Sequence, residues 1–300
     1  MPAVRSFVVT GSGGFVGSVL LAHLRDPPQR LHLAPADWRD RIAAASFEGA
    51  TVVHLAARVH APRSDPGLYE TDNREKTEVL ARAAARGGAR RFVFLSSVKA
   101  LGEETREAPF SVHTQPRPLD AYGRSKLAAE RALEGVARAS SMEFVVVRAP
   151  LVFGAGAAGN LRALLRLCDS PWPLPFAAVH NRRSFVHVSD LARLLLACAG
   201  APSAAGSTYL AAHREPFSTT QLFATIRRAL GRPPRLVAMS PRVLEALARI
   251  AGRADTMRRL TRSLEVDPAA AQRDLGWMAA VPLESAVEEM VAAYRAERPR

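Results

Sequence analysis

Tyr122 and Lys126 stand four positions apart in the stretch AYGRSK, with only small or polar residues between them. Four residues make about one turn of an α-helix, so in a helix both side chains point the same way. A phenol, with a pKa of about 10, is a poor base at neutral pH, and a neighbouring ammonium favours the phenolate and lowers that pKa. The pair therefore predicts a general base at Tyr122. The same spacing also occurs by chance in helices, so the surrounding segments must show whether the pair is functional.

Ser96 and Ser97 close an apolar, strand-like run, RRFVFLSS (90–97), that lies upstream of the pair. In open α/β sheets, ligands bind at the carboxyl ends of the strands. A serine hydroxyl at that edge can donate a hydrogen bond to a reacting oxygen and hold it against the tyrosine. We therefore expect Ser97 to aim the substrate at Tyr122.

Three glycines, Gly11, Gly14 and Gly17, follow one another at three-residue spacing between the first strand-like run and the first helical segment. Glycines there permit a tight turn, let the backbone approach a pyrophosphate and allow close helix–strand packing, while the helix N-terminus faces the phosphate charge. In this setting the motif predicts dinucleotide binding. The positive charge of an oxidised nicotinamide would lower the pKa of Tyr122 further, so that the tyrosine takes the proton of a substrate hydroxyl while hydride leaves the same carbon.

Apolar runs alternate with helical segments through the first half of the chain. The runs are β-branched and apolar on both faces, as in parallel strands covered by helices, and they lie at 4–11, 50–57, 90–97 and 142–149. Alanine- and leucine-rich segments typical of helices lie near 15–25, 38–48, 71–87 and 122–139. The alternation predicts a Rossmann-like α/β fold with a doubly wound parallel sheet.

After Pro150 the chain changes to Gly- and Pro-rich connections between short helices. We expect a strand at 184–188 and a helix at 189–199, and from about 216 onward helices without a parallel-sheet pattern. The prediction is a dinucleotide-binding domain over 1–155, whose sheet the chain rejoins by about 184–199, and a smaller, mostly helical C-terminal substrate lobe over 156–300.

The chain carries 41 Lys and Arg against 28 Asp and Glu, a formal net charge of +13. The arginine pairs are scattered and no aromatic residues alternate with them for base stacking, so we predict no nucleic-acid partner. Lysine stands only at Lys76, Lys99 and Lys126, so the excess of arginine is a chain-wide bias. A basic surface nevertheless favours a substrate that carries phosphate.

The two cysteines, Cys168 and Cys198, lie in apolar surroundings without Cys/His ligand spacing, which predicts buried thiols in a reducing compartment and no metal site. No segment approaches the roughly 18 uninterrupted apolar residues that a membrane helix needs. The first strand begins almost at Met1, which leaves no room for a targeting peptide. We expect a cytoplasmic protein without membrane insertion.

These residues belong to a series of motifs that occurs in the same order and spacing in a known family. The motifs are Gly11-x-x-Gly14-Phe15-Val16-Gly17, His54-Leu55-Ala56-Ala57, Asn73, Ser96-Ser97, Tyr122-x-x-x-Lys126 and Arg148-Ala-Pro-Leu-Val-Phe-Gly154. On them the chain resembles the NAD-dependent epimerase/dehydratase family of extended short-chain dehydrogenase/reductases. Within that family it is most similar to the UDP-glucose 4-epimerase-like and UDP-sugar 4-ketoreductase proteins of bacterial surface-polysaccharide synthesis. The resemblance covers nearly the whole chain, through Asn160, 181–187 and 266–277.

The resemblance implies a role for each of these residues. Ser97, Tyr122 and Lys126 would be the catalytic set, and Lys126 would also hold the nicotinamide ribose of NAD, with NADP left open. The residues that would bind the cofactor are Gly11, Gly14, Phe15, Val16, Gly17, Leu55, Ala56, Ala57, Asn73, Tyr122 and Lys126. Ser97, Asn160 and Arg183 would bind a UDP-sugar or a related nucleotide sugar. A guanidinium fork at Arg183 suits diphosphate oxygens, with an ordinary surface arginine as the alternative. A homodimer would pair through two helices that include the one carrying Tyr122.

Dehydratases of this family carry an acid pair directly after the catalytic hydroxyl residue, and here those positions hold Val98 and Lys99, so we do not expect dehydration. Reversible oxidation of a sugar carbinol remains, either with the keto sugar turning before it takes hydride back, as in an epimerase, or with release of the product, as in a dehydrogenase or ketoreductase. The sequence leaves both open. Two other possibilities are a non-catalytic, cofactor-binding regulatory protein and a hydroxysteroid-dehydrogenase-like oxidoreductase. The latter would call for an apolar pocket in place of Asn160 and Arg183.

The segment after the first helix departs from the family pattern. Family members place there a second strand, ending in an acid that hydrogen-bonds the adenosine ribose about 20 residues past the glycines. In one interpretation, 31–34 is that strand and Asp37 is the ribose acid, a cofactor-binding residue. In the other, which we favour because Ala36-Asp37-Trp38 matches the exit of the family's third strand, the second strand and its acid are missing and Asp37 lies near the adenine. The second interpretation predicts an uncovered sheet edge and weak cofactor binding.

Overall fold

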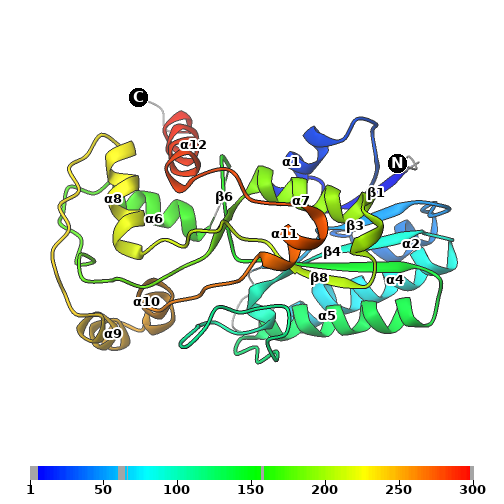
Figure 1. The fold of residues 1–300 in the computed structure, drawn as a ribbon, viewed down its shortest axis with the longest axis horizontal. Helices are drawn as coiled ribbons and strands as arrows, with labels where there is room; N and C mark the ends of the chain where they lie inside the picture. Colours follow the sequence, from blue (N-terminus) through cyan, green and yellow to red (C-terminus); the bar gives the residue numbers. More distant parts are fainter. Residues whose placement is uncertain (1–5, 60–64, 66, 157–158, 298–300) are drawn as a thin grey trace.

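The predicted sheet is present and contains six parallel strands (Figure 1). In spatial order they are β2 (Gln29–Leu31), β1 (Phe7–Thr10), β3 (Thr51–His54), β4 (Arg91–Ser97), β5 (Glu143–Ala149) and β8 (Ser207–Leu210). The computed structural model describes residues 6–59, 65, 67–156 and 159–297, without the side chain of Asn160. The chain adds β2 on one side of β1 and β3 on the other, so the carboxyl edge between β1 and β3 is the switch point at which open α/β sheets bind ligands.

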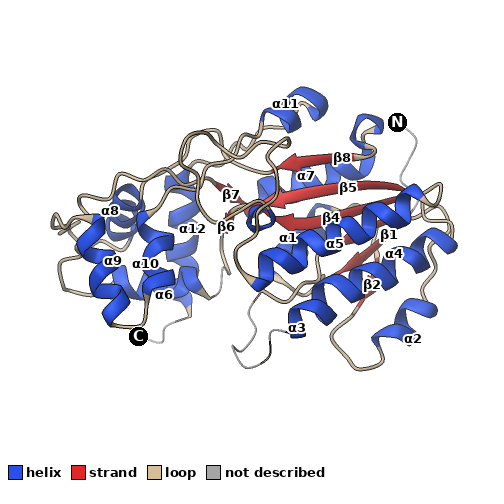
Figure 2. Ribbon diagram, turned by 90° about the horizontal axis from the view of Figure 1, so that it is seen from below, coloured by secondary structure: helices blue, strands red, loops and turns tan. Residues whose placement is uncertain are grey.

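Helices cover both faces of this sheet (Figure 2). One layer contains α1 (Phe15–His23) and α7 (Val188–Gly200), and the other contains α2 (Trp38–Ala43), α4 (Lys76–Arg86) and α5 (Ala121–Arg138). Val9 packs in the core of the first layer and its neighbour Val8 in the core of the second, since successive strand residues point to opposite faces. Burial on both faces explains why the strands are continuously apolar in the sequence.

A second lobe lies beyond the carboxyl ends of the strands; in Figure 2 the arrowheads of β4, β5 and β8 point toward it. Its elements are β6 (Leu151–Phe153), α6 (Asn160–Cys168), β7 (Phe185–His187), α8 (Thr219–Ala229), α9 (Pro241–Ile250), α10 (Ala254–Thr261) and α12 (Leu283–Ala296). β6 and β7 form a small parallel sheet, and the helices pack around a core that includes Phe153, Phe223 and Met290. The lobe therefore faces the edge of the main sheet where ligands are expected.

Short elements complete the fold. They are α3 (Gly67–Tyr69) and the π-helical turn Glu70–Glu75 that follows it, the 3₁₀ turns Val98–Ala100 and Pro202–Ala204, and α11 (Ala269–Leu275). Because α3, the π-helical turn and α4 run on without a break, a single wider turn interrupts one long helix. Such turns are frequent at functional sites, and Asn73 lies in this one.

Most of the predicted elements are confirmed. β1, β3, β4 and β5 match the four predicted strands, and α1, α2, α4 and α5 match the helices. The expected strand at 184–188 and helix at 189–199 are β7 and α7, but β7 pairs with β6 and not with the main sheet. The strand that rejoins the main sheet is β8, at the edge beside β5, where its sequence STYL is too short and too polar to stand out. The domain boundary at about residue 155 stays a prediction.

The favoured interpretation of the segment after α1, in which the second strand is missing, is wrong. β2 pairs in parallel with β1, from Val8 opposite Gln29 to Thr10 opposite Leu31. Leu31 and Leu33 are buried in the core that contains Trp38, so the apolar run does cover this edge of the sheet. The strand stays short because prolines stand close by on both sides, and a proline supplies no backbone N–H to a strand pair.

Both cysteines are buried, as expected, Cys198 against the main sheet and Cys168 in the core of the second lobe. Burial raises the pKa of each thiol to about 12, so both stay protonated. In the part of the chain that the structure describes, no helix combines the length and the apolar character that crossing a membrane requires.

Candidate active site

The glycine loop lies between β1 and α1, at the switch point. Gly11 has a φ of 69°, and a Cβ there would come within 2.6 Å of the Ala56 backbone nitrogen. A Cβ on Gly17 would run into the carbonyl oxygen of Gly11. Both positions therefore require glycine, one for backbone conformation and close approach and the other for helix–strand packing.

The N-terminus of α1 has spare capacity to bind an anion. Its N-cap residue, Gly14, offers no side chain to the first N–H groups, and the first turn contains no acidic residue. Unpaired N–H groups and the positive end of the helix dipole make such a terminus a phosphate site. The loop and the helix together fit the pyrophosphate of a dinucleotide.

Ser97 and Tyr122 meet where β4 ends and α5 begins. Asp120 caps α5, accepting a hydrogen bond of 2.6 Å from the Gly123 N–H. Gly123 faces the carbonyl of Lys99 with no room for a Cβ, so this glycine lets α5 approach the turn that follows β4. Both side chains line the same cavity, and Ser97 lies close enough to Tyr122 to lower the pKa of its phenol. The structure thus brings together two of the three residues predicted to be catalytic.

The pKa of Tyr122 moves in the opposite direction to our expectation. Burial raises it from 10.0 to about 12, and Ser97 lowers it only in part, while Asp120 and Tyr69 add to the rise. The prediction that the protein's own charges lower this pKa is wrong. Burial removes the phenolate from water and makes it costly, and the sequence pattern gave no measure of that effect.

Lys126 lies one turn along α5 with its ammonium turned to the sheet. It donates a 2.7 Å hydrogen bond to the Leu95 carbonyl and lies 4.0 Å from the centroid of the Phe94 ring. Burial lowers the pKa of Lys126 to about 7, against the opposing effect of Glu130. At neutral pH the ammonium is thus only partly charged, which explains why it does little for the phenol.

Two residues predicted to contact the cofactor lie behind the site. Asn73 donates 2.9 Å and 3.0 Å hydrogen bonds to Ser125 Oγ and the Arg58 carbonyl and accepts one of 2.7 Å from the Arg58 N–H. It therefore joins the segment after β3 to α5, the helix of Tyr122. Ala56 backs Gly11 and donates to Thr10 Oγ1. Both residues lie behind the cavity wall and hold in place the residues that form it.

A cavity of about 570 Å³ unites most of the predicted residues. From that set its walls contain Gly11, Gly14, Phe15, Val16, Gly17, Leu55, Ala57, Ser97, Tyr122, Lys126 and Arg183. The walls also contain residues that were not predicted to be catalytic or to bind cofactor or substrate, among them Val98, Lys99, Pro150, Gly159, Arg259 and Leu264. The glycine loop, the predicted catalytic groups and two arginines of the second lobe therefore share one space.

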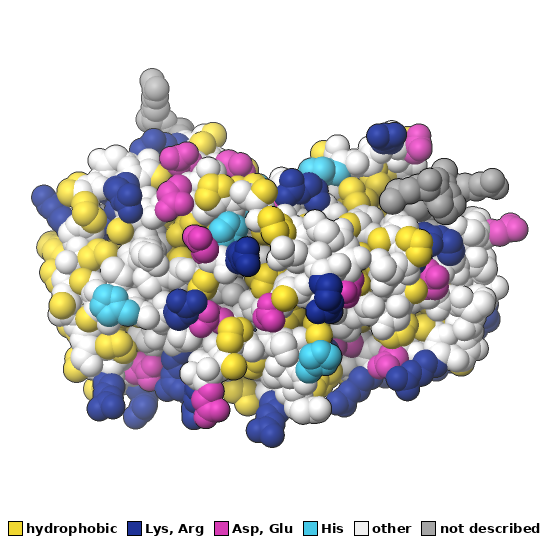
Figure 3. Space-filling view, in the orientation of Figure 1, with side chains coloured by type: hydrophobic (Ala, Val, Ile, Leu, Met, Phe, Trp, Pro, Cys, Tyr) yellow, Lys and Arg dark blue, Asp and Glu magenta, His cyan; other side chains and the backbone are white. Residues whose placement is uncertain are grey.

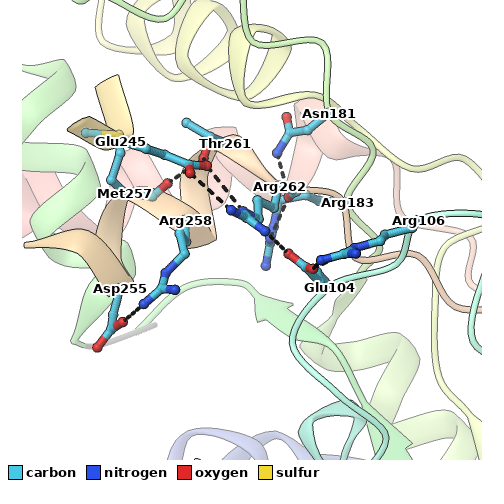
Figure 4. A network of polar contacts seen from close by, with 10 residues as sticks. All are labelled: Glu104, Arg106, Asn181, Arg183, Glu245, Asp255, Met257, Arg258, Thr261 and Arg262. Carbon is cyan, nitrogen blue, oxygen red and sulfur yellow. Dashed lines mark hydrogen bonds and ion pairs between the residues drawn. The ribbon is translucent and has the colours of Figure 1, made fainter. Parts of the chain in front are cut away.

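Arg183 and Arg259 form the lobe side of this cavity. Burial first, and then the charge of Arg259, lowers the pKa of Arg183 to about 10, so the guanidinium stays protonated at neutral pH. Its Nη1 donates a 3.0 Å hydrogen bond to the Arg262 carbonyl, and Arg262 is ion-paired with Glu104 and Glu245 (Figure 4). Two like charges held together in a cavity indicate an anion site.

Lys99, at one of the two positions where dehydratases of the family carry acids, is a lysine with acidic neighbours. Its ammonium pairs with Glu103 at 3.0 Å and with Asp120, and lies 6.0 Å from the centroid of the Tyr122 ring. The structure thus shows an ion-paired lysine at this position. The expectation that this chain is not a dehydratase stays a prediction.

Asp37 and Asn160 are not placed in the cavity. Asp37 is the N-cap residue of α2 and pairs with Arg41 at 2.8 Å, and that hydrogen bond lowers its pKa. It is not among the described residues that line the cavity. Asn160 begins α6, and its side chain lies outside the described part of the structure. The predicted contact of Asp37 has no support from the geometry, and that of Asn160 stays a prediction.

Comparison with known proteins adds to this geometry. The sequence profile described as "NAD dependent epimerase/dehydratase family" matches residues 7–212. UDP-glucose 4-epimerase from Vibrio cholerae is 32% identical over 313 residues, which cover 97% of this chain and 95% of that protein. The solved structure of UDP-glucose 4-epimerase from Thermotoga maritima with UDP-glucose aligns with a TM-score of 0.78 at 21% identity, over 97% of this chain and 99% of that one. A short-chain dehydrogenase/reductase superfamily protein from Agrobacterium tumefaciens with bound NAD aligns with a TM-score of 0.77 at 21% identity, over 97% and 98% of the two chains. The two structures share the Rossmann-like fold described above.

Proposed function

The chain belongs to the NAD dependent epimerase/dehydratase family, and from that premise we propose that it is a UDP-sugar 4-epimerase acting through Ser97, Tyr122 and Lys126. The observation that carries the proposal is the shared cavity: the glycine loop, the Ser97–Tyr122 pair and the charged arginines all line it. The similarity to an epimerase over almost the full length of both chains favours 4-epimerisation over net reduction.

The residues of the first domain fit a dinucleotide. Gly11, Gly14 and Gly17, with the N-terminus of α1, would hold its pyrophosphate, and Lys126 its nicotinamide ribose. When bound, the nicotinamide would supply the acceptor and donor of hydride, and in its oxidised form a positive charge beside the phenol. In a buried site, such a charge acts strongly because little water screens it.

The chain's own residues handle the proton. Tyr122 Oη would take the proton of the sugar C4 hydroxyl, while Ser97 Oγ donates a hydrogen bond to the same oxygen and keeps it in line with the phenol. Ser97 and Tyr122 both line the cavity, and Ser97 is close enough to affect the pKa of the phenol, so the two groups can reach the same oxygen. Tyr122 would return the proton to the oxygen after the keto sugar has turned.

The arginines would hold the other end of the substrate. Arg183 keeps its charge at neutral pH, and together with Arg259 it would bind the diphosphate, which leaves the sugar free to turn at the opposite wall. A hydroxysteroid would find these charges where it needs an apolar wall. A non-catalytic regulatory protein would have no use for a serine, a tyrosine and a lysine around one point.

Incubation of the purified chain with UDP-glucose or UDP-galactose and NAD tests the proposal. We expect inversion at C4, seen by proton NMR, with no net change in the absorbance of reduced nicotinamide. In Tyr122→Phe we expect the inversion to be lost. Stoichiometric formation of reduced cofactor without inversion would contradict epimerisation and identify a dehydrogenase. Cofactor binding without any reaction of these sugars would contradict the choice of substrate.

A further inference from the structure

Helix α9 exposes a row of large apolar side chains. Val243, Leu247 and Ile250 have 47%, 53% and 86% of their surface exposed. Spacings of four and three residues place them on one face of the helix. The face that packs on the lobe is a different one, made by Leu244 and Ala248, which are buried. The exposed row therefore does not contribute to the packing of α9 against the lobe.

Arginines lie beside this row. Arg242 and Arg249, seven residues apart and so on one side of α9, are both exposed, and Arg253 follows the helix. The segment 240–263 contains six arginines, of which Arg259 lines the cavity described above, and only two acids. Both acids already have arginine partners, Glu245 with Arg262 and Asp255 with Arg258. The segment thus presents a surplus of positive charge next to its apolar row.

Helix α9 lies on the side of the lobe away from the main sheet (Figures 1 and 2). In the space-filling view, Lys and Arg side chains gather at the lower left, over α9 and α10, with apolar atoms beside them (Figure 3). The main sheet and the helices that cover it do not obstruct this side. A flat, extended surface can therefore approach α9 without meeting the rest of the protein.

We propose that α9 docks the protein on an anionic lipid surface, with the row Val243–Leu247–Ile250 entering the headgroup region and the arginines facing lipid phosphates. A surface helix with an apolar face flanked by arginines has the composition of interfacial helices. Nucleic acid would match the charge and leave the apolar row in water. A protein partner or a second copy would need an acidic surface with an apolar centre, and the charge complementarity between these arginines and lipid phosphates favours the lipid.

Cosedimentation of the full chain with vesicles measures this docking. The probes are vesicles of phosphatidylglycerol and phosphatidylcholine in equal parts, and vesicles of phosphatidylcholine alone as the neutral reference. One variant, Leu247→Ser/Ile250→Ser, removes apolar area, and another, Arg242→Gln/Arg249→Gln, removes two charges. The matched control is Arg138→Gln/Arg273→Gln, which removes two exposed arginines from α5 and α11. Circular dichroism confirms that each variant is folded.

We expect binding to the anionic vesicles only, weaker at higher salt and at least tenfold weaker in the apolar variant. The arginine variant should lose about fivefold for each charge, on the order of 20-fold in total. The control should bind within about twofold of the unaltered chain. No binding to anionic vesicles overturns the proposal, as does an equal loss in the control, which would mean a diffuse effect of net charge. Concentration-dependent self-association abolished by Leu247→Ser/Ile250→Ser, without vesicle binding, would overturn it in favour of a second copy.

Discussion

The two ends of the cavity use burial in opposite ways. At the end formed by β4 and α5, burial suppresses charge: the pKa of Tyr122 rises to about 12 and that of Lys126 falls to about 7. At the lobe end, burial also lowers the pKa of Arg183, but only to about 10, and Arg259 lies close by. Because an arginine starts from so high a pKa, it survives burial as a cation. At the first end, the pKa of the Lys126 amine therefore lies near neutral pH while the phenol stays protonated, and the second end carries a fixed charge.

The largest effect should come from the proton-handling end. Tyr122→Phe removes the only atom proposed to exchange a proton with the substrate, so we expect kcat to fall by about 10²- to 10⁴-fold. The binding of a UDP-sugar to the arginine end should stay within about threefold, measured by calorimetry. Tyr69→Phe is the matched control: its hydroxyl donates to the Val59 carbonyl, and although Tyr69 adds to the rise in the pKa of Tyr122, it exchanges no proton with the substrate in the proposed reaction. An equal loss of kcat in both variants would mean that the hydroxyls act through structure alone.

The second prediction concerns the buried amine of Lys126. Its folded pKa of about 7 lies below its ordinary 10.5, so between these values the unfolded chain binds a proton that the folded chain does not. The stability of the folded chain should therefore rise with pH above 7, by up to about 1.4 kcal/mol per pH unit, and level off below pH 7. In Lys126→Met, urea unfolding between pH 7 and pH 9 should lack this slope.

Lys99→Met is the control for that slope. It removes an ammonium that is paired with two carboxylates and leaves Lys126 in place, so the slope should persist. A slope that survives in Lys126→Met would assign the pH dependence to another group. The comparison between the two ends would then lose its basis in desolvation.

The proton-handling end could be predicted from the sequence because its residues stand in short motifs. Ser97 ends a strand, and Tyr122 and Lys126 are one helical turn apart, so local rules of strands and helices place all three. The sign of the pKa shift of Tyr122 could not be predicted, because it depends on how completely neighbouring elements cover the phenol. The sequence shows which residues are adjacent along the chain, but not how deeply each side chain is buried in the folded protein.

The arginine end was predictable only in part. Arg183 was found through the family resemblance, whereas Arg259 is one of many arginines in the sequence. Its place beside Arg183 depends on contacts between distant segments, such as the Leu264 N–H donating to the Arg182 carbonyl at 2.9 Å. The short strand β8 was not predicted, and a strand near β2 was only the less favoured interpretation, for a similar reason. Whether such short segments form strands depends more on pairing with a longer neighbouring strand than on their own composition.

The third prediction tests whether the lobe end carries the fixed charge that binds substrate. Arg183→Gln and Arg259→Gln should each raise the KM for a UDP-sugar by about 10- to 100-fold, the range for a lost hydrogen bond to a charged group, with a smaller effect on kcat. Arg182→Gln is the control beside them: its side chain is 63% exposed and pairs with Glu265, so KM should change by less than about twofold. A loss confined to kcat in the two cavity variants would place these arginines at the reacting end instead.

The smallest effect should come from the ion pairs that hold the lobe end in place. Arg262 accepts the Arg183 hydrogen bond through its carbonyl, and its guanidinium is tied to Glu104 in the segment that follows β4. This pairing lowers the pKa of Glu104, so the carboxylate stays charged at neutral pH. Glu104→Gln should loosen Arg262, and through it Arg183, and raise KM about two- to fivefold with kcat unchanged, because a partly exposed ion pair contributes about 1 kcal/mol or less.

Glu48→Gln, at an exposed position in the first domain, is the control and should leave KM unchanged. Below the ordinary pKa of a glutamate, near 4.5, protonation of Glu104 should bring the unaltered chain toward the KM of the variant. If the two KM values do not converge as the pH falls, Glu104 acts through packing, and the charge of the lobe end does not depend on this ion pair for its position.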